Sequence, residues 1–161
     1  MANPNLLAKH NSELARAAAA AMQQNYQDTI EVCSELLTGC VYPEMEASGD
    51  AVSARRCRAE ARLLMATAMH YTDSHHEDVL RVLNHALDSP PQVQKDVYFT
   101  MAVVQLSAEE PEAARASMEK CLEVIAALRE VEASDTSFAD QEKEAREFLA
   151  QIAQQKKPMV N

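Results

Sequence analysis

Glycine and proline are scarce in this chain: two glycines and six prolines occur among 161 residues, and tryptophan is absent. All-β domains need frequent turns rich in glycine and proline, so this scarcity disfavours them. No segment shows the β-branched, alternating pattern of a strand, whereas good helix formers such as Ala, Leu, Glu, Gln and Met are abundant. Because 47% of the residues are apolar, a core can form. The sequence predicts one all-α domain over residues 1–161.

Basic residues are also in the minority, with 15 Lys and Arg against 25 Asp and Glu and a net charge of −10. A negative protein repels phosphate backbones and anionic lipid, so we expect no nucleic acid partner. The run from Ala17 to Ala21 is too short for a signal-peptide core or a membrane span, so we expect no membrane insertion. Four cysteines without a CxxC pair are typical of free thiols in a reducing, cytoplasmic setting.

Motifs of catalysis and metal binding are missing as well. The chain has no GxSxG, no phosphate-binding glycine loop and no local Cys-His pairing, so we expect no enzyme and no catalytic residues. Four histidines invite a metal hypothesis, but no two of them have the i, i+4 spacing of ligands on one helix. We therefore expect no metal and no cofactor. These histidines are His70, His75, His76 and His85.

Helical periodicity and punctuation residues divide the chain into about seven helices. Asn3 and Pro4 predict a capped first helix, and Gly39 predicts a left-handed end to the second. The spacing of Ser74 and Glu77 predicts a capping box at a later helix start. The expected units are a helix pair over about 4–38, an acidic loop over 39–49, pairs over about 50–89 and 92–131, and a capping helix over about 137–157.

The three predicted helix pairs carry similar residues at equivalent positions. His76 and Pro111, at two predicted turns, lie 35 positions apart, close to the roughly 34-residue period of tetratricopeptide repeats. Tyr26 and His76 lie 50 positions apart, which indicates an insertion of about 16 residues. Small residues occur midway along the first helix of each pair, and a pair of mostly apolar residues ends each second helix. The small residues are Ala17, Thr67 and Ala102, and the end pairs are Leu36-Leu37, Ala86-Leu87 and Cys121-Leu122.

This pattern resembles the tetratricopeptide repeat family, with three degenerate repeats and a C-terminal capping helix. The first repeat departs from the family pattern because Glu13 and Arg16 stand where apolar residues are usual. The resemblance implies an α-α superhelix whose concave groove binds an extended or helical segment of another protein. Carried onto this chain, the family's groove positions are Leu14, Ala18, Ala21, Leu64, Ala68, Tyr71, Phe99, Val103 and Leu106.

The predicted groove is almost wholly apolar, which is typical of a protein contact. An alternative is that the C-terminal helix, or another copy of the protein, covers it. Family members that bind the C-termini of heat-shock proteins clamp a carboxylate with Lys, Asn and Arg. The matching positions here, which include Leu14, Met65, Asp96 and Thr100, could not hold a carboxylate. We therefore do not expect a carboxylate clamp.

One basic stripe stands out in this acidic chain. Arg55, Arg58 and Arg62 share one face of the predicted third helix, where they could dock an acidic partner or form a solvated face balanced by Glu60 and the acidic loop.

The function expected from the sequence is a protein–protein adaptor whose groove binds a segment with apolar side chains. A second hypothesis is a dedicated chaperone for exported hydrophobic proteins, because length, acidity and repeat number resemble the class II chaperones of type III secretion. A third is a self-assembling structural component, present as a homo-oligomer.

Overall fold

The computed structural model describes residues 3–132 and 137–155, and these residues form eight α-helices without a strand. The all-α class predicted from the sequence is confirmed. Within the described residues, no helix has both the length and the apolar character that a membrane crossing requires. The helices are α1 (Pro4–Met22), α2 (Tyr26–Thr38), α3 (Val41–Ala47), α4 (Ala51–His70), α5 (His76–Ala86), α6 (Pro91–Ser107), α7 (Pro111–Val131) and α8 (Ser137–Gln155).

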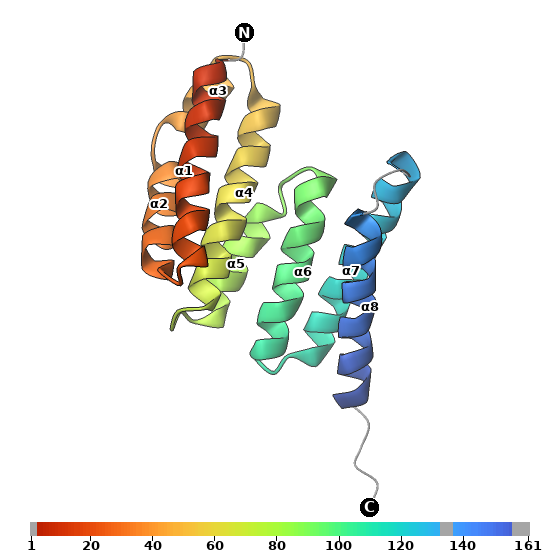
Figure 1. Cartoon of the computed structure of the whole chain (residues 1–161). Helices are drawn as coiled ribbons and strands as arrows, with labels where there is room; N and C mark the ends of the chain where they lie inside the picture. The colour runs from red at the N-terminus through yellow and green to blue at the C-terminus, as the bar shows by residue number, and fades with distance from the viewer. Residues whose placement is uncertain (1–2, 133–136, 156–161) are drawn as a thin grey trace, which may run out of the picture.

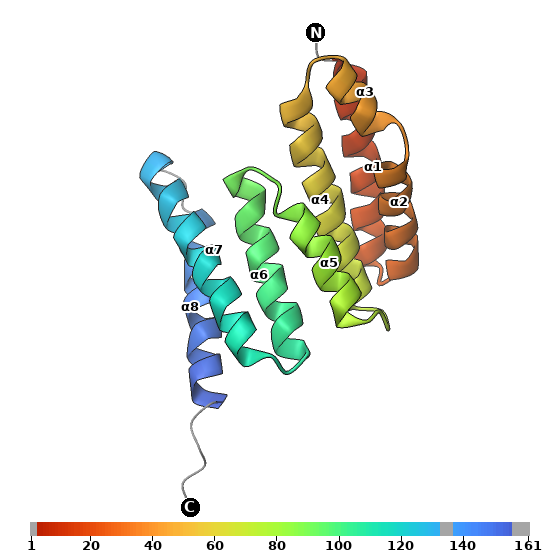
Figure 2. The same ribbon diagram turned by 180° about the vertical axis from the view of Figure 1, so that it is seen from behind.

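The helices are arranged in two layers that follow one another along an elongated array. In Figure 1, α1, α4, α6 and α8 lie in front, and Figure 2 shows α2, α5 and α7 from behind. Successive helices α1 and α2, α4 and α5, and α6 and α7 form antiparallel pairs joined by short turns. Helices α1, α4, α6 and α8 therefore lie on the same side of the array.

The first helix begins as the sequence predicts. The Asn5 backbone N–H donates to Asn3 Oδ1 at 3.0 Å, and Pro4 occupies the first helical position. Proline is favoured there because its missing N–H would have no acceptor within the helix and its φ is already helical. The other prolines at helix starts, Pro91 of α6 and Pro111 of α7, act in the same way.

Two predictions about helix ends are wrong. Gly39 follows α2 with φ −81° and ψ −167°, an extended conformation rather than a left-handed one. Its small size is needed for another reason, since a Cβ at this position would lie 2.9 Å from the Glu35 carbonyl oxygen. The capping box at α5 does not form, because the helix begins one residue later, after His75. The Ser74 hydroxyl lies 3.1 Å from the hydroxyl of Thr72 instead.

The acidic loop expected over 39–49 is also wrong, because Val41–Ala47 forms the short helix α3. Val41, Tyr42 and Met45 share one face of α3 and are buried at 6%, 0% and 2% exposure. They join a core cluster with Leu36 of α2 and with small residues of α4. Pro43 is tolerated because it lies in the first helical turn. The apolar face outweighs the loop-like composition of this segment.

The core is a series of clusters between neighbouring helices. The central cluster joins α4, α5 and α6 through residues such as Leu83 and Val97, and the next joins α6, α7 and α8 through Met118 and Ile125. Helix α4 contributes mainly alanines to these contacts, and short side chains allow helix axes to approach closely. Its buried alanines are Ala54, Ala59, Ala61, Ala66 and Ala68.

Candidate functional site

A hollow of about 550 Å³ is lined by residues of α1, α4 and α6. These three helices follow one another in the front layer (Figure 1). We call the hollow the α1/α4/α6 groove. Each helix contributes residues at helical spacing, so each presents one stripe of side chains to the groove. Five of the lining residues are apolar, two are threonines and two are acidic. They are Leu14, Ala18, Glu60, Leu63, Leu64, Thr67, Val93, Asp96 and Thr100.

Three of the nine groove residues predicted from the sequence line this hollow: Leu14, Ala18 and Leu64. Ala68 is buried at 1% exposure, because it packs inside the array. Tyr71 is 62% exposed and stacks on Tyr26 with ring centroids 5.2 Å apart, beyond the end of α4. Ala21 and Val103 are half-buried and do not line the hollow.

The third-repeat part of the predicted groove is partly covered by α8. Phe99 of α6 lies against Phe148 of α8, with ring centroids 6.4 Å apart. The amide of Gln141 donates to Asp96 Oδ1 at 2.6 Å. Leu106 lines a separate hollow with Gln155, at the last turn of α8. The C-terminal helix therefore contacts the predicted groove at Phe99 and Leu106, and the hollow that stays open is lined by α1, α4 and the first part of α6.

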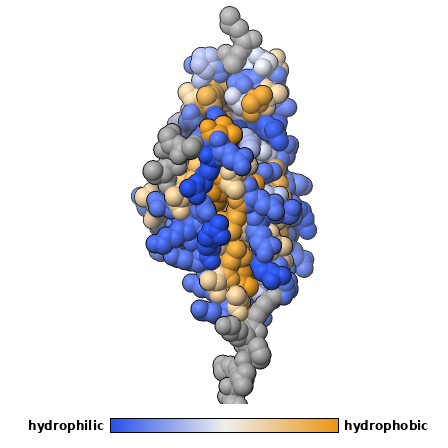
Figure 3. All heavy atoms as spheres, turned by 90° about the vertical axis from the view of Figure 1, so that its right-hand side faces the viewer, coloured by the Kyte–Doolittle hydropathy of each residue, from blue (hydrophilic) through white to orange (hydrophobic). Residues whose placement is uncertain are grey.

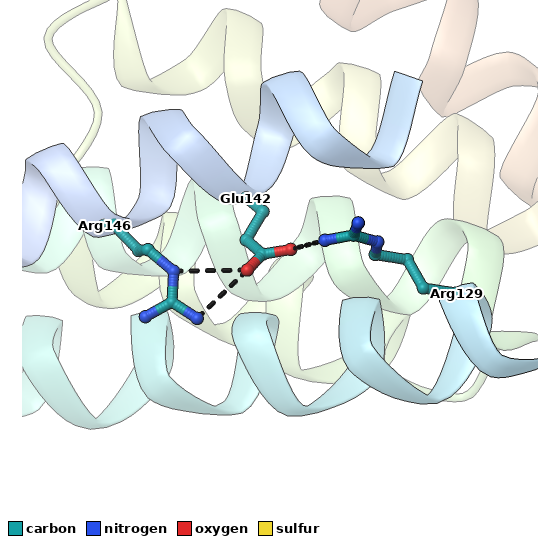
Figure 4. Close-up of polar contacts among 3 residues, drawn as sticks. All are labelled: Arg129, Glu142 and Arg146. Carbon is teal, nitrogen blue, oxygen red and sulfur yellow. Dashed lines mark hydrogen bonds and ion pairs between the residues drawn. The ribbon is translucent and has the colours of Figure 1, made fainter. Parts of the chain in front are cut away.

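Helix α8 is fastened to α7 by a charged bridge as well as by apolar packing. Glu142 accepts hydrogen bonds from Arg146 at 3.0 and 3.2 Å, and also from Arg129 of α7 (Figure 4). The Arg146 hydrogen bond, followed by that of Arg129, lowers the pKa of Glu142 below its ordinary value. Phe138 and Ile152 of α8 are buried, and Phe138 belongs to the core cluster of α6, α7 and α8. An apolar strip between polar flanks marks this end of the array (Figure 3).

The polar side chains of the groove are mainly hydrogen-bond acceptors. Asp96 Oδ1 accepts from Lys95 at 3.0 Å and from Gln141, whereas Asp96 Oδ2 has no hydrogen bond within the described part of the chain. Glu60 lies 3.2 Å from Arg56 Nε and 3.7 Å from His10 Nε2. The set of lining residues includes no lysine and no arginine. The sequence pattern alone predicts no binding role for Glu60, Leu63 or Val93.

A buried polar cluster lies behind Glu60. His10 is fully buried, and its Nδ1 is 2.9 Å from the hydroxyl of Tyr42. Burial lowers the pKa of His10, but the side chains of Cys57 and Glu60 raise it more, to about 9. Burial raises the pKa of Tyr42, and the Arg58 guanidinium lies 5.6 Å from the centre of its ring. The cluster joins α1, α3 and α4 beneath the groove.

The predicted basic stripe makes contacts within the chain. Arg55 Nε pairs with Asp88 at 2.6 Å, and Arg58 pairs with Glu46. Arg62 Nη1 donates to the His85 carbonyl at 3.4 Å. The three arginines therefore link α4 to α3, to α5 and to the turn after α5. Docking of an acidic partner on this stripe stays a prediction.

No group of three or more His, Cys, Asp or Glu residues is placed to hold a metal ion in residues 3–132 and 137–155. The chain matches no protein-family model, no curated protein and no solved structure. The resemblance to the tetratricopeptide repeat family stays a prediction made from the sequence.

Proposed function

We propose that the protein is a non-catalytic adaptor that binds a segment of a partner protein in the α1/α4/α6 groove. The observation that carries the proposal is the open hollow of about 550 Å³, lined by apolar side chains of three separate helices. A concave apolar surface with a few polar groups is the usual form of a binding site. The partner would place apolar side chains against Leu14, Leu63, Leu64 and Val93.

The helices that line the groove support this role energetically. α1, α4 and α6 are held by core clusters on their inner faces, so the groove exists before the partner arrives. Binding to a preformed site avoids the cost of ordering the receptor. Each apolar side chain of the partner that passes from water to a fully buried position contributes about 1.5–3 kcal/mol to the free energy of binding. Micromolar affinity corresponds to about 8 kcal/mol, and association itself costs at least about 4 kcal/mol, so roughly four to eight such side chains are needed.

Ala18 allows a direct test, because its neighbour Ala19 is an exposed residue of the same helix and serves as a matched control. Ala18→Gln would fill part of the groove, whereas Ala19→Gln makes the same change outside it. A library of synthetic peptides of about 12 residues, rich in apolar side chains, is titrated by fluorescence anisotropy. We expect the peptides that bind the wild type to bind Ala18→Gln at least about tenfold more weakly and Ala19→Gln equally well.

Equal affinity of both variants for every bound peptide would reject the groove as the site. A library without any binder would reject the adaptor proposal itself. Thermal unfolding of both variants, measured in parallel, shows that each is folded at the assay temperature.

The end of the array formed by α7 and α8 favours self-assembly as a second candidate function. An apolar strip crosses this end of the array (Figure 3). Leu122 and Val124 of α7 and Leu149 of α8 are only partly buried. Apolar surface at the end of a helical array is a common contact between proteins. Light scattering over a range of protein concentrations tests this candidate. A mass that rises with concentration supports it, and a constant monomer mass rejects it.

A further inference from the structure

We infer that the α1/α4/α6 groove selects a partner segment that presents a lysine or arginine side chain next to apolar side chains. This inference rests on the proposed function of the groove and adds the chemistry of the ligand. Its basis is the polar composition of the groove, whose lining includes two carboxylates, Glu60 and Asp96, but no lysine or arginine; the cations paired with them, Arg56 and Lys95, lie outside the lining.

Asp96 provides the clearest acceptor. Both of its hydrogen bonds, from Lys95 and Gln141, end on Oδ1, and Oδ2 has none among the described residues. The side chain is 42% exposed, so a ligand can reach it. The Lys95 ammonium lies 5.8 Å from the centre of the Phe138 ring of α8, and Lys95 does not line the groove. Asp96 Oδ2 therefore accepts no hydrogen bond from residues 3–132 and 137–155, although the carboxylate as a whole is paired with Lys95.

The neighbouring helix α4 contributes the second carboxylate, whose two oxygens lie 3.2 Å from Arg56 Nε and 3.7 Å from His10 Nε2. Glu60 comes from α4, and the cations near it, Arg56 and His10, do not line the groove. The Thr67 hydroxyl donates to the Leu63 carbonyl at 2.8 Å, which leaves its oxygen free to accept. A ligand in the groove thus meets acceptor groups from two helices, α4 and α6.

The apolar lining favours the same ligand. Lysine and arginine have long aliphatic stems that pack on apolar surface while their charged ends reach a polar group. Here the stem would lie against Leu14, Leu64 and Val93, and the charged end would donate to Asp96 and Glu60. A ligand carboxylate in the same place would be repelled by Asp96 and Glu60.

The test uses three leucine-rich peptides of about 12 residues that differ only at one central position, which is Lys, Gln or Glu. They are titrated against the full chain by fluorescence anisotropy. We expect the Lys peptide to bind at least about tenfold more tightly than the Gln peptide, and the Glu peptide to bind most weakly. Asp96→Asn is expected to reduce the Lys peptide to the affinity of the Gln peptide. The matched control Asp73→Asn, at an exposed residue outside the groove, is expected to change nothing.

Because Asp96 also holds Gln141 of α8, a second variant gives an independent result. Thr100→Lys introduces an ammonium group among the lining residues and is expected to weaken binding of the Lys peptide at least about tenfold while leaving the Gln peptide nearly unaffected. If the Lys and Glu peptides bind the wild type equally well, and Ala18→Gln still abolishes their binding, the cation selectivity is overturned. The adaptor proposal would remain intact in that case. Binding that Ala18→Gln does not change would overturn the proposed site itself.

Discussion

The burial of Met45 leads to a quantitative prediction about α3, the helix that replaces the expected acidic loop. Met45 is 2% exposed and packs with Val41 and Tyr42 in the cluster between α2, α3 and α4. Met45→Ala removes most of this buried side chain and leaves a cavity. Such substitutions cost about 2–5 kcal/mol, and we expect about 3 kcal/mol here. For a chain of this size, each kcal/mol lowers Tm by about 2–4 °C, so the expected loss is about 6–12 °C.

Glu44→Ala is the matched control, because Glu44 is an exposed residue of the same short helix. Its removal is expected to cost less than about 1 kcal/mol, mainly through the helix dipole. Unfolding of both variants in urea, followed by circular dichroism, gives the two free energies. If 41–47 were a solvated loop, both substitutions would have the same small effect. Equal free energies of unfolding would therefore refute the assignment of α3 as a packed helix.

Two further predictions concern pH and thiol chemistry. The pKa of His10 is raised from 6.5 to about 9, so its protonated form stabilises the fold fully below about pH 6.5, and this contribution is lost as the pH rises through 9. The free energy of unfolding, measured in urea, should therefore fall by up to about 3 kcal/mol between pH 6.5 and 9. His10→Gln should remove most of this fall. A wild-type free energy that does not change with pH would contradict the contacts assigned to His10. Iodoacetamide should modify only the exposed Cys40 of the native protein, because Cys33, Cys57 and Cys121 are buried. Burial also raises the pKa of Cys33 to about 12 and that of Cys121 to about 11, which disfavours the reactive thiolate. Mass spectrometry that finds a second thiol modified at the rate of Cys40 would contradict this burial.

The long helices could be predicted because their signals are local. Asn3 and Pro4 cap α1, and the prolines at 91 and 111 start α6 and α7, so chain punctuation and helical periodicity agree. α3 has only seven residues and one proline, which is too short for periodicity to be recognised. Its helix forms because α2 and α4 offer an apolar surface to Val41, Tyr42 and Met45, and that surface is a tertiary feature.

The groove was predictable only in part for a similar reason. The repeat pattern identified Leu14, Ala18 and Leu64 because residues four apart on a helix, or at equivalent places in successive repeats, tend to share a face. It could not show that α8 would cover Phe99, since that contact joins segments far apart in the chain. Nor could it place Glu60 in the groove, because that depends on how α4 is rotated against its neighbours.

The charge of the whole chain and the charge of the groove have different consequences for a basic partner. A net charge of −10 raises the rate of encounter with any basic protein, whichever surface it touches. Exposed charges are screened beyond about 8 Å at physiological ionic strength, so this attraction cannot distinguish one basic segment from another. Discrimination must come from contacts shorter than the screening length. In the proposed complex, Asp96 Oδ2 offers such a contact next to the apolar lining of the groove. The affinity for a partner side chain would then depend on both its charge and its apolar stem.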